Sequence, residues 1–129
     1  MDKQELKDRT KTFALRILTM VDKLPKSTSG YAIAKQVVRS GTSVAANYRA
    51  ACMARSRQEF LAKLGIVLEE ADETCFWIEI INEGKLLPAP DVIPLHDEAS
   101  QIRAIILSAI RTTRDSTAVS NQISKSSNP

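Results

Sequence analysis

The sequence is poor in the residues that interrupt helices. Only four glycines and five prolines occur among its 129 residues. Glycine and proline are the strongest breakers of a helical pattern, so their scarcity favours long helices joined by short turns. The apolar fraction of 43% and the charged fraction of 26% are typical of a globular domain. The length predicts one domain that can bury a core without disulfides or metals.

Histidine is almost absent as well. The single histidine, His96, lies beside Asp97 and Glu98, and we expect it to be a solvated surface residue. Metal centres in four-helix bundles typically use two Glu-x-x-His motifs, and no such motif occurs in the sequence. The sequence therefore predicts neither a metal site nor a bound cofactor.

The patterns of nucleophilic catalysis and of phosphate loops are also missing. Ser40, Ser43 and both cysteines have no base that the sequence places near them, although a catalytic nucleophile needs one. Gly30 and Gly41 are isolated and do not form a glycine-rich loop, the motif that would cradle phosphates. We therefore expect a protein that is not an enzyme and has no small-molecule substrate.

Neither cysteine pairing nor an apolar leader is indicated. Cys52 and Cys75 fall within apolar helical patterns without Cys-x-x-Cys spacing, and we expect buried thiols in a reducing compartment. The first residues lack the apolar run of a signal peptide. No segment approaches the roughly 18 apolar residues that indicate a membrane span. These features predict a cytoplasmic protein without a membrane partner.

Charges of opposite sign are segregated along the chain. The segment from Lys23 to Gln58 contains seven basic residues and no acidic one, whereas that from Glu59 to Glu98 contains ten acidic residues and two lysines. Basic surfaces attract polyanions, and basic and acidic elements attract each other. One acidic cluster could in principle bind Mg²⁺, but solvation or ion pairing is the simpler expectation; it comprises Glu69, Glu70, Asp72 and Glu73.

Apolar residues recur at spacings of three, four and seven, which predicts four amphipathic helices at about 2–24, 30–55, 57–83 and 92–114. Pro25 ends the first helix, and Ser56 with Glu59 forms a capping box before the third. Gly84 follows the third helix at the C′ position, where a positive φ is cheap for glycine. The fold class is all-α: residues 1–114 form an antiparallel up-down-up-down four-helix bundle. The polar segment 115–129 is expected to be a disordered tail.

Two helices carry faces that the core of one bundle does not need. The second helix presents small residues beside Arg39 and Asn47, and the third has an apolar strip about 150° from its core stripe. Two apolar strips on one helix imply two packing partners, so we predict a homo-oligomer. We also expect Arg39 and Asn47 to pair with Glu70 or Glu73. The predicted subunit-interface residues are Arg39, Ser43, Asn47, Ile66, Glu70, Glu73, Trp77 and Ile80.

A basic cluster flanks the turn between the second and third helices. We predict that it binds nucleic acid, because clustered cations that bind a phosphate backbone release its counterions, which favours the complex. It comprises Arg49, Arg55, Arg57 and Lys63. A solvated face or pairing with the acidic helix is the alternative. A second candidate surface lies on the first helix, around Lys3, Lys7 and Lys11.

Residues 38–51 read VRSGTSVAANYRAA, and residues 55–64 read RSRQEFLAKL, followed by the acidic run 69–74 and Trp77. Together these segments resemble the bacterial four-helix-bundle proteins named after the 23S rRNA intervening sequence. The resemblance is strong over 38–87 and extends as a pattern over about 5–114. The family motif matches at Arg39, Ser43, Asn47, Tyr48, Arg49, Phe60, Lys63, Glu70 and Glu73. Ala50 departs from it, because the family usually has Glu or a similar residue there.

The resemblance implies a four-helix subunit assembled into a closed ring, a homopentamer in known relatives. It also implies kinship with the accessory variability protein of diversity-generating retroelements, a basic pentamer that engages a reverse transcriptase and nucleic acid. We therefore expect a non-enzymatic, homo-oligomeric, pentameric protein that binds RNA or other nucleic acid. The alternative is a protein-interaction scaffold whose ring docks a polymerase or reverse transcriptase.

Overall fold

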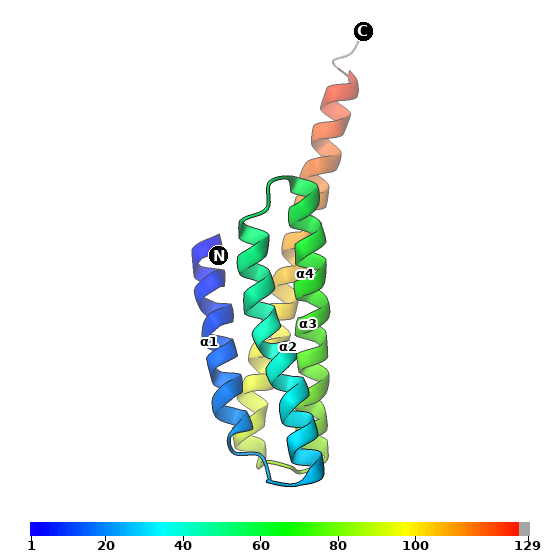
Figure 1. Cartoon of the computed structure of the whole chain (residues 1–129). Helices are drawn as coiled ribbons and strands as arrows, with labels where there is room; N and C mark the ends of the chain where they lie inside the picture. Colours follow the sequence, from blue (N-terminus) through cyan, green and yellow to red (C-terminus); the bar gives the residue numbers. More distant parts are fainter. Residues whose placement is uncertain (127–129) are drawn as a thin grey trace.

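The computed structural model describes the chain from residue 1 to 126, and its side chains from residue 1 to 116. Four helices account for nearly all of it: α1 (Lys3–Val21), α2 (Thr28–Cys52), α3 (Arg57–Glu83) and α4 (Ala89–Ser126). No strand occurs in these residues. Figure 1 shows the four helices side by side, with the α2–α3 turn and the start of α1 at the same end of the bundle. The all-α four-helix prediction is confirmed.

Polar side chains cap the first three helices. Asp2, Ser27 and Ser56 each accept a hydrogen bond from the backbone amide three residues further on, which satisfies one of the free amides of the first turn. At α3 the amide of Glu59 donates to Ser56 Oγ at 3.0 Å, as the capping box predicts. The Glu59 carboxylate, however, accepts from the amide of Arg55 at 3.4 Å and not from that of Ser56.

The end of α3 differs from the prediction by one residue. Gly84 has a φ of −78°, and the left-handed residue is Lys85, with a φ of 55°. The amide of Leu86 donates to the carbonyl of Ile81 at 3.0 Å, which is the long hydrogen bond of a Schellman motif and makes Lys85 the C′ residue. The helix therefore includes Gly84 as its C-cap before the chain turns.

The last helix is longer than the predicted 92–114. It begins at Ala89 and continues to Ser126, so residues 115–126 are helical where a disordered tail was expected; residues 127–129 lie outside the described part. No glycine or proline follows Pro94 until residue 129, and polar residues lower helix propensity by only a few tenths of a kcal/mol each. Figure 1 shows α4 projecting beyond the end of the bundle where the α2–α3 turn lies.

All four helices contribute to one core. Each fully buried large apolar side chain stabilises the fold by about 1.5–3 kcal/mol. At the α1–α2 crossing, a Cβ on Gly41 would lie 2.9 Å from Ile17 Cγ1, so glycine permits the close approach of the two helices. Among residues 1–126, no helix has the length and apolar character needed to cross a membrane. The largest fully buried apolar side chains are Phe13, Ile17, Val37, Val44, Leu64, Val67, Ile78, Ile81, Val92, Ile102 and Ile106.

Candidate nucleic-acid interface

Three lysines of α1 lie on the side of this helix that faces α2. Lys3, Lys7 and Lys11 are spaced by four residues, and residues at this spacing stack along one face of a helix. Each step rises about 6 Å, because an α-helix rises about 1.5 Å per residue. The three side chains line two hollows that adjoin each other along α1.

The first, which we call the side hollow, lies between α1 and α2 and has a volume of about 520 Å³. Lys7 and Lys11 line it from α1, and Arg49 lines it from α2. The small residues Thr42, Ala45 and Ala46 leave the space open between them. One carboxylate, Asp8, also lines it and accepts a hydrogen bond from Gln4 Nε2 at 3.0 Å. The side hollow therefore carries three cations and one anion.

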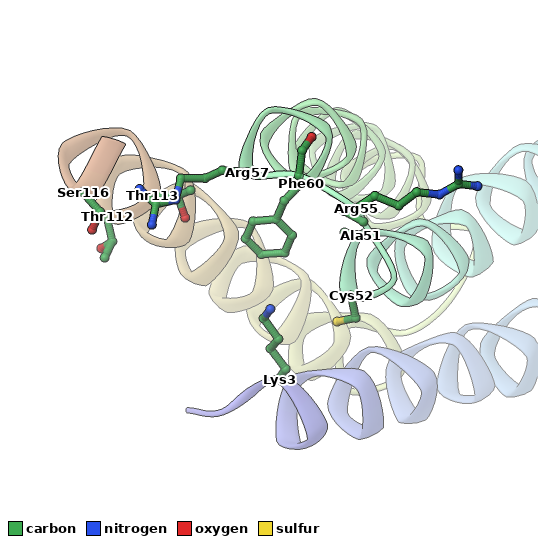
Figure 2. Close-up of a pocket in the computed structure, with 11 residues that line it drawn as sticks. Lys3, Ala51, Cys52, Arg55, Arg57, Phe60, Thr112, Thr113 and Ser116 are labelled. Carbon is green, nitrogen blue, oxygen red and sulfur yellow. The ribbon is translucent and has the colours of Figure 1, made fainter. Parts of the chain in front are cut away.

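The second, which we call the end pocket, has a volume of about 420 Å³ and lies where the α2–α3 turn meets the start of α1 and the later part of α4. Lys3, Arg55, Arg57 and Phe60 line it, and Figure 2 shows Lys3 pointing toward Phe60. The distance from Lys3 Nζ to the centroid of the Phe60 ring is 4.8 Å, a cation–π contact. Hydroxyl groups of α4 complete the wall, at Thr112, Thr113 and Ser116.

The cations of these hollows form no ion pair within the part of the chain whose side chains are described. Within residues 1–116, ion pairs involve Arg9, Lys23, Arg39, His96 and Arg103. None of the six cations of the two hollows takes part in one, and they are Lys3, Lys7, Lys11, Arg49, Arg55 and Arg57. Unpaired positive charges at concave surfaces attract polyanions, so this region is the candidate nucleic-acid interface.

The structure divides the basic cluster predicted from the sequence. Arg55 and Arg57 line the end pocket, and Arg49 lines the side hollow. Lys63 lines neither hollow. The lysines of α1, which the sequence offered only as a second candidate surface, belong to the same two hollows. Apart from Lys63, the predicted basic cluster and the lysines of α1 therefore belong to one surface.

Residues of α4 in the end pocket could not be predicted from the sequence. Thr112 and Ser116 lie where we expected the fourth helix to end and the tail to begin. Their one signal is the absence of a helix breaker after Pro94, which would have favoured a longer helix. No pattern in the sequence indicates that this helix passes beside the α2–α3 turn.

The predicted pairing of Arg39 with the acidic helix is present within one chain. Arg39 Nη1 lies 3.2 Å from Glu70 Oε2, and Nη2 contacts Glu73 Oε2. Asn47 does not join this pairing as expected. Its Nδ2 donates to the carbonyl of Ser43 at 2.9 Å and to Ser43 Oγ at 2.7 Å, because side chains four residues apart in a helix lie over each other.

The apolar strip predicted on α3 is only partly exposed. Ile66 is 39% exposed, whereas Trp77 is half-buried and packs against the core of its own chain. The indole Nε1 of Trp77 is buried and has no hydrogen-bond partner among the described residues. The adjacent Phe76, which the sequence analysis did not select, is 49% exposed and packs edge-on against Trp77 at 5.0 Å. Ile66 and Phe76 are thus the large apolar side chains that α3 presents to solvent.

The expectations for His96 and for the two cysteines can be compared with the structure. His96 is half-buried, not freely solvated, and its Nε2 lies 2.9 Å from Glu79 Oε2 of α3. Cys75 is buried as expected, and burial raises the pKa of its thiol, whereas Cys52 is only half-buried. Burial likewise raises the pKa of Tyr48 in the core, with a smaller contribution from Cys52. No group of three or more potential metal ligands occurs within the described residues.

The fold and the two hollows define an all-α four-helix-bundle protein with an unpaired basic surface at one end. The model of the 23S rRNA-intervening sequence protein family matches residues 2–108. The chain therefore belongs to this family.

A solved structure supports the same assignment. It is a protein of unknown function from the S23 ribosomal protein family of Bacteroides thetaiotaomicron, with 32% sequence identity and a TM-score of 0.79. The match covers 86% of this chain and 99% of that chain. No match was found among curated proteins.

Proposed function

We propose that this chain is a non-enzymatic nucleic-acid-binding protein whose ligand is a single strand of RNA. One observation carries the proposal: six cations gather in two adjoining hollows without an ion pair within residues 1–116. An unpaired cation gives up no native partner when it binds a phosphate, and it releases a counterion from the nucleic acid. The name of the family, which refers to an intervening sequence of 23S rRNA, is consistent with an RNA ligand.

The arrangement favours recognition of the backbone over that of particular bases. Lys3, Lys7 and Lys11 follow one line along α1, and their steps of about 6 Å allow successive contacts along an extended strand. Non-specific single-strand proteins add aromatic side chains on which successive bases stack. In the two hollows Phe60 is the one aromatic lining residue, and Lys3 lies over its ring. We therefore expect low sequence selectivity.

We also propose that the chain, an antiparallel up-down-up-down bundle, assembles into a closed homopentameric ring in the cytoplasm. The pentamer comes from the family resemblance, and the exposed Ile66 and Phe76 on α3 are consistent with a contact between copies. A ring repeats the basic hollows by symmetry. One strand that reaches several subunits then binds with avidity far above that of a single site.

The exposed apolar residues of α3 also favour a second candidate function. The acidic residues Glu69 and Asp72 lie between Ile66 and Phe76 along α3, and such a mixed surface suits a protein partner. Under this alternative the ring is a scaffold that docks a polymerase or reverse transcriptase, and its basic hollows meet an acidic surface of that partner.

A salt titration of labelled single-stranded RNA tests the first proposal. We expect binding by the wild type to weaken with salt, with a log–log slope of about −0.7 for each phosphate neutralised. The variant Arg49→Glu/Arg55→Glu/Arg57→Glu should lose affinity at least about a hundredfold and should have a slope shallower by about 2.

The matched control is Lys26→Glu/Lys35→Glu/Lys85→Glu, which makes the same change in charge away from the two hollows. All three lysines are exposed, and none forms an ion pair within residues 1–116. This control should keep the wild-type slope and most of the affinity. Absence of RNA binding by the wild type at low salt would favour the scaffold function. Equal losses in the two variants would indicate that only net charge matters.

A further inference from the structure

The end pocket is lined by two cationic groups that come from different elements and lie on different sides of it. Figure 2 shows Lys3 rising from α1 toward the ring of Phe60, while Arg57 reaches from the start of α3 toward Thr113 and Ser116 of α4. The cation–π contact of 4.8 Å with Phe60 holds the ammonium of Lys3 at the pocket. The guanidinium of Arg55 points away from these groups. Lys3 and Arg57 are thus the cations available to a group inside the pocket.

We propose that the end pocket binds a terminal phosphomonoester of the RNA strand; the proposal rests on the function proposed above. A phosphomonoester carries a charge of about −1.5 to −2 at pH 7 and has three strong acceptor oxygens. An internal phosphodiester carries a single negative charge. A pocket lined by two cations therefore favours the end of a phosphorylated strand over its interior.

The hydroxyl groups of the pocket suit the same ligand. Thr113 Oγ1 already donates to the carbonyl of Ala109 at 2.8 Å, whereas Thr112 and Ser116 are exposed on α4 beside Arg57. Hydroxyls can donate to the phosphate oxygens that the two cations leave free. The volume of about 420 Å³ lies within the range of small-ligand sites, roughly 300–1,000 Å³.

The lining of the end pocket, within the described side chains, is free of carboxylates. Three acidic residues are next to lining residues in the sequence. Asp2 accepts from the amide of Glu5 at 2.8 Å, and Glu59 accepts from the amide of Arg55 at 3.4 Å. Asp115 is exposed on α4 between Thr113 and Ser116 and is not a lining residue of the pocket. The end pocket differs in this respect from the side hollow, which includes Asp8.

The position of the pocket also explains why it would bind the end of an RNA strand and not its interior. Lys3 lies one helical turn before Lys7, so a strand that follows the side hollow along α1 and α2 leads to the end pocket. There it meets α4, which lines the pocket with Thr112 and Ser116 and continues beyond the bundle (Figure 1). A strand that meets this wall is expected to stop at it.

The experiment compares three single-stranded RNAs of the same sequence and internal label, with a 5′-phosphate, a 3′-phosphate or hydroxyls at both ends. Each is titrated at fixed salt with the full chain and with Arg57→Gln, Lys3→Gln and Arg55→Gln. We expect one or both phosphorylated RNAs to bind the wild type about tenfold more tightly than the hydroxyl RNA, a factor equal to about 1.4 kcal/mol. Arg57→Gln and Lys3→Gln should abolish this preference. Arg55→Gln is the matched control and should weaken all three RNAs by the same factor.

The outcomes separate the two proposals. Equal affinity of the wild type for all three RNAs would overturn the terminal-phosphate site and leave the RNA-binding function intact. Loss of the preference in Arg55→Gln, with its retention in Arg57→Gln, would also overturn the site as described. Absence of binding by every RNA would overturn the proposed function and the site together. Circular dichroism of each variant checks that helical content is unchanged.

Discussion

The basic end of the bundle and the outer face of α2 and α3 use similar residues in opposite ways. At the basic end, cations such as Lys7, Arg49 and Arg57 have no carboxylate partner within residues 1–116. On the outer face, Arg39 of α2 contacts both Glu70 and Glu73 of α3. The cations of the first region remain available to a ligand, whereas the cation of the second region is paired with carboxylates of the same chain.

The same contrast occurs within α1 alone. Arg9 faces α4, where Nε lies 2.8 Å from Glu98 Oε2 and Nη2 lies 2.7 Å from Oε1. Lys7, two residues earlier on the side that faces α2, lines the side hollow without an ion pair. A neighbouring helix with a carboxylate at the right height neutralises a cation, and one with alanine and threonine leaves it free. The function of a basic residue here depends on the helix that it faces.

The largest expected effect concerns the exposed apolar residues of α3. Ile66→Glu/Phe76→Glu places two carboxylates on the exposed apolar part of α3, where burial of each side chain between copies would be worth about 1.5–3 kcal/mol. We expect light scattering to show that the proposed oligomer dissociates to a chain of 14.2 kDa with unchanged helical content.

The control for this variant is Leu15→Glu on α1, which changes an exposed apolar residue outside the predicted interface. It should leave the assembly intact. Trp77→Glu is a poorer test, because Trp77 packs against its own core and its replacement would also destabilise the single chain. A monomeric wild type at micromolar concentration would contradict the proposed assembly.

A smaller effect concerns the pairing of Arg9 with Glu98. The hydrogen bonds from Arg9 hold the pKa of Glu98 below its ordinary value, so the ion pair contributes stability above the unfolded pKa of about 4.3 and loses it as the pH falls through the folded pKa. Glu98→Gln should lower the free energy of unfolding at pH 7 by about 1–2 kcal/mol, since the pair is charge-assisted but partly exposed. In thermal unfolding from pH 7 to 2, the difference from wild type should shrink below about pH 4. A difference independent of pH would show that packing and not charge stabilises this contact.

The smallest effect concerns Arg39, which is 49% exposed in its side chain. Solvent screens such a pair, so Arg39→Gln and Glu73→Gln should each cost less than about 1 kcal/mol. The double variant should cost less than the sum of the two, because one interaction is removed in all three. Urea unfolding measures the four free energies of this cycle. Strict additivity would mean that the contact adds no stability. Arg39 would then have no stabilising partner within the chain, like the cations of the basic end.

The all-α class and much of the core could be predicted from the spacing of apolar residues. Leu64, Val67 and Ile78 follow the core stripe predicted for α3 and are fully buried. The pairing of Arg39 with the acidic helix was also predictable, because oppositely charged helices joined by a short turn lie side by side. Helix ends were less certain, as Lys85 and the long α4 show, because hydrogen bonding and packing decide whether a weak helix former stays helical.

The sequence by itself determined the fold class, the family and the segregation of charge, since helical periodicity and motif spacing are local properties of the chain. The tertiary structure decided which charges remain free. It brought Lys3 of α1, Arg57 of α3 and Ser116 of α4 around one pocket, although these residues are far apart in the sequence. It also turned Arg9 toward Glu98 and Lys7 toward the side hollow. Whether a charge is neutralised depends on the residues across from it, and only the packing of the helices sets which residues those are.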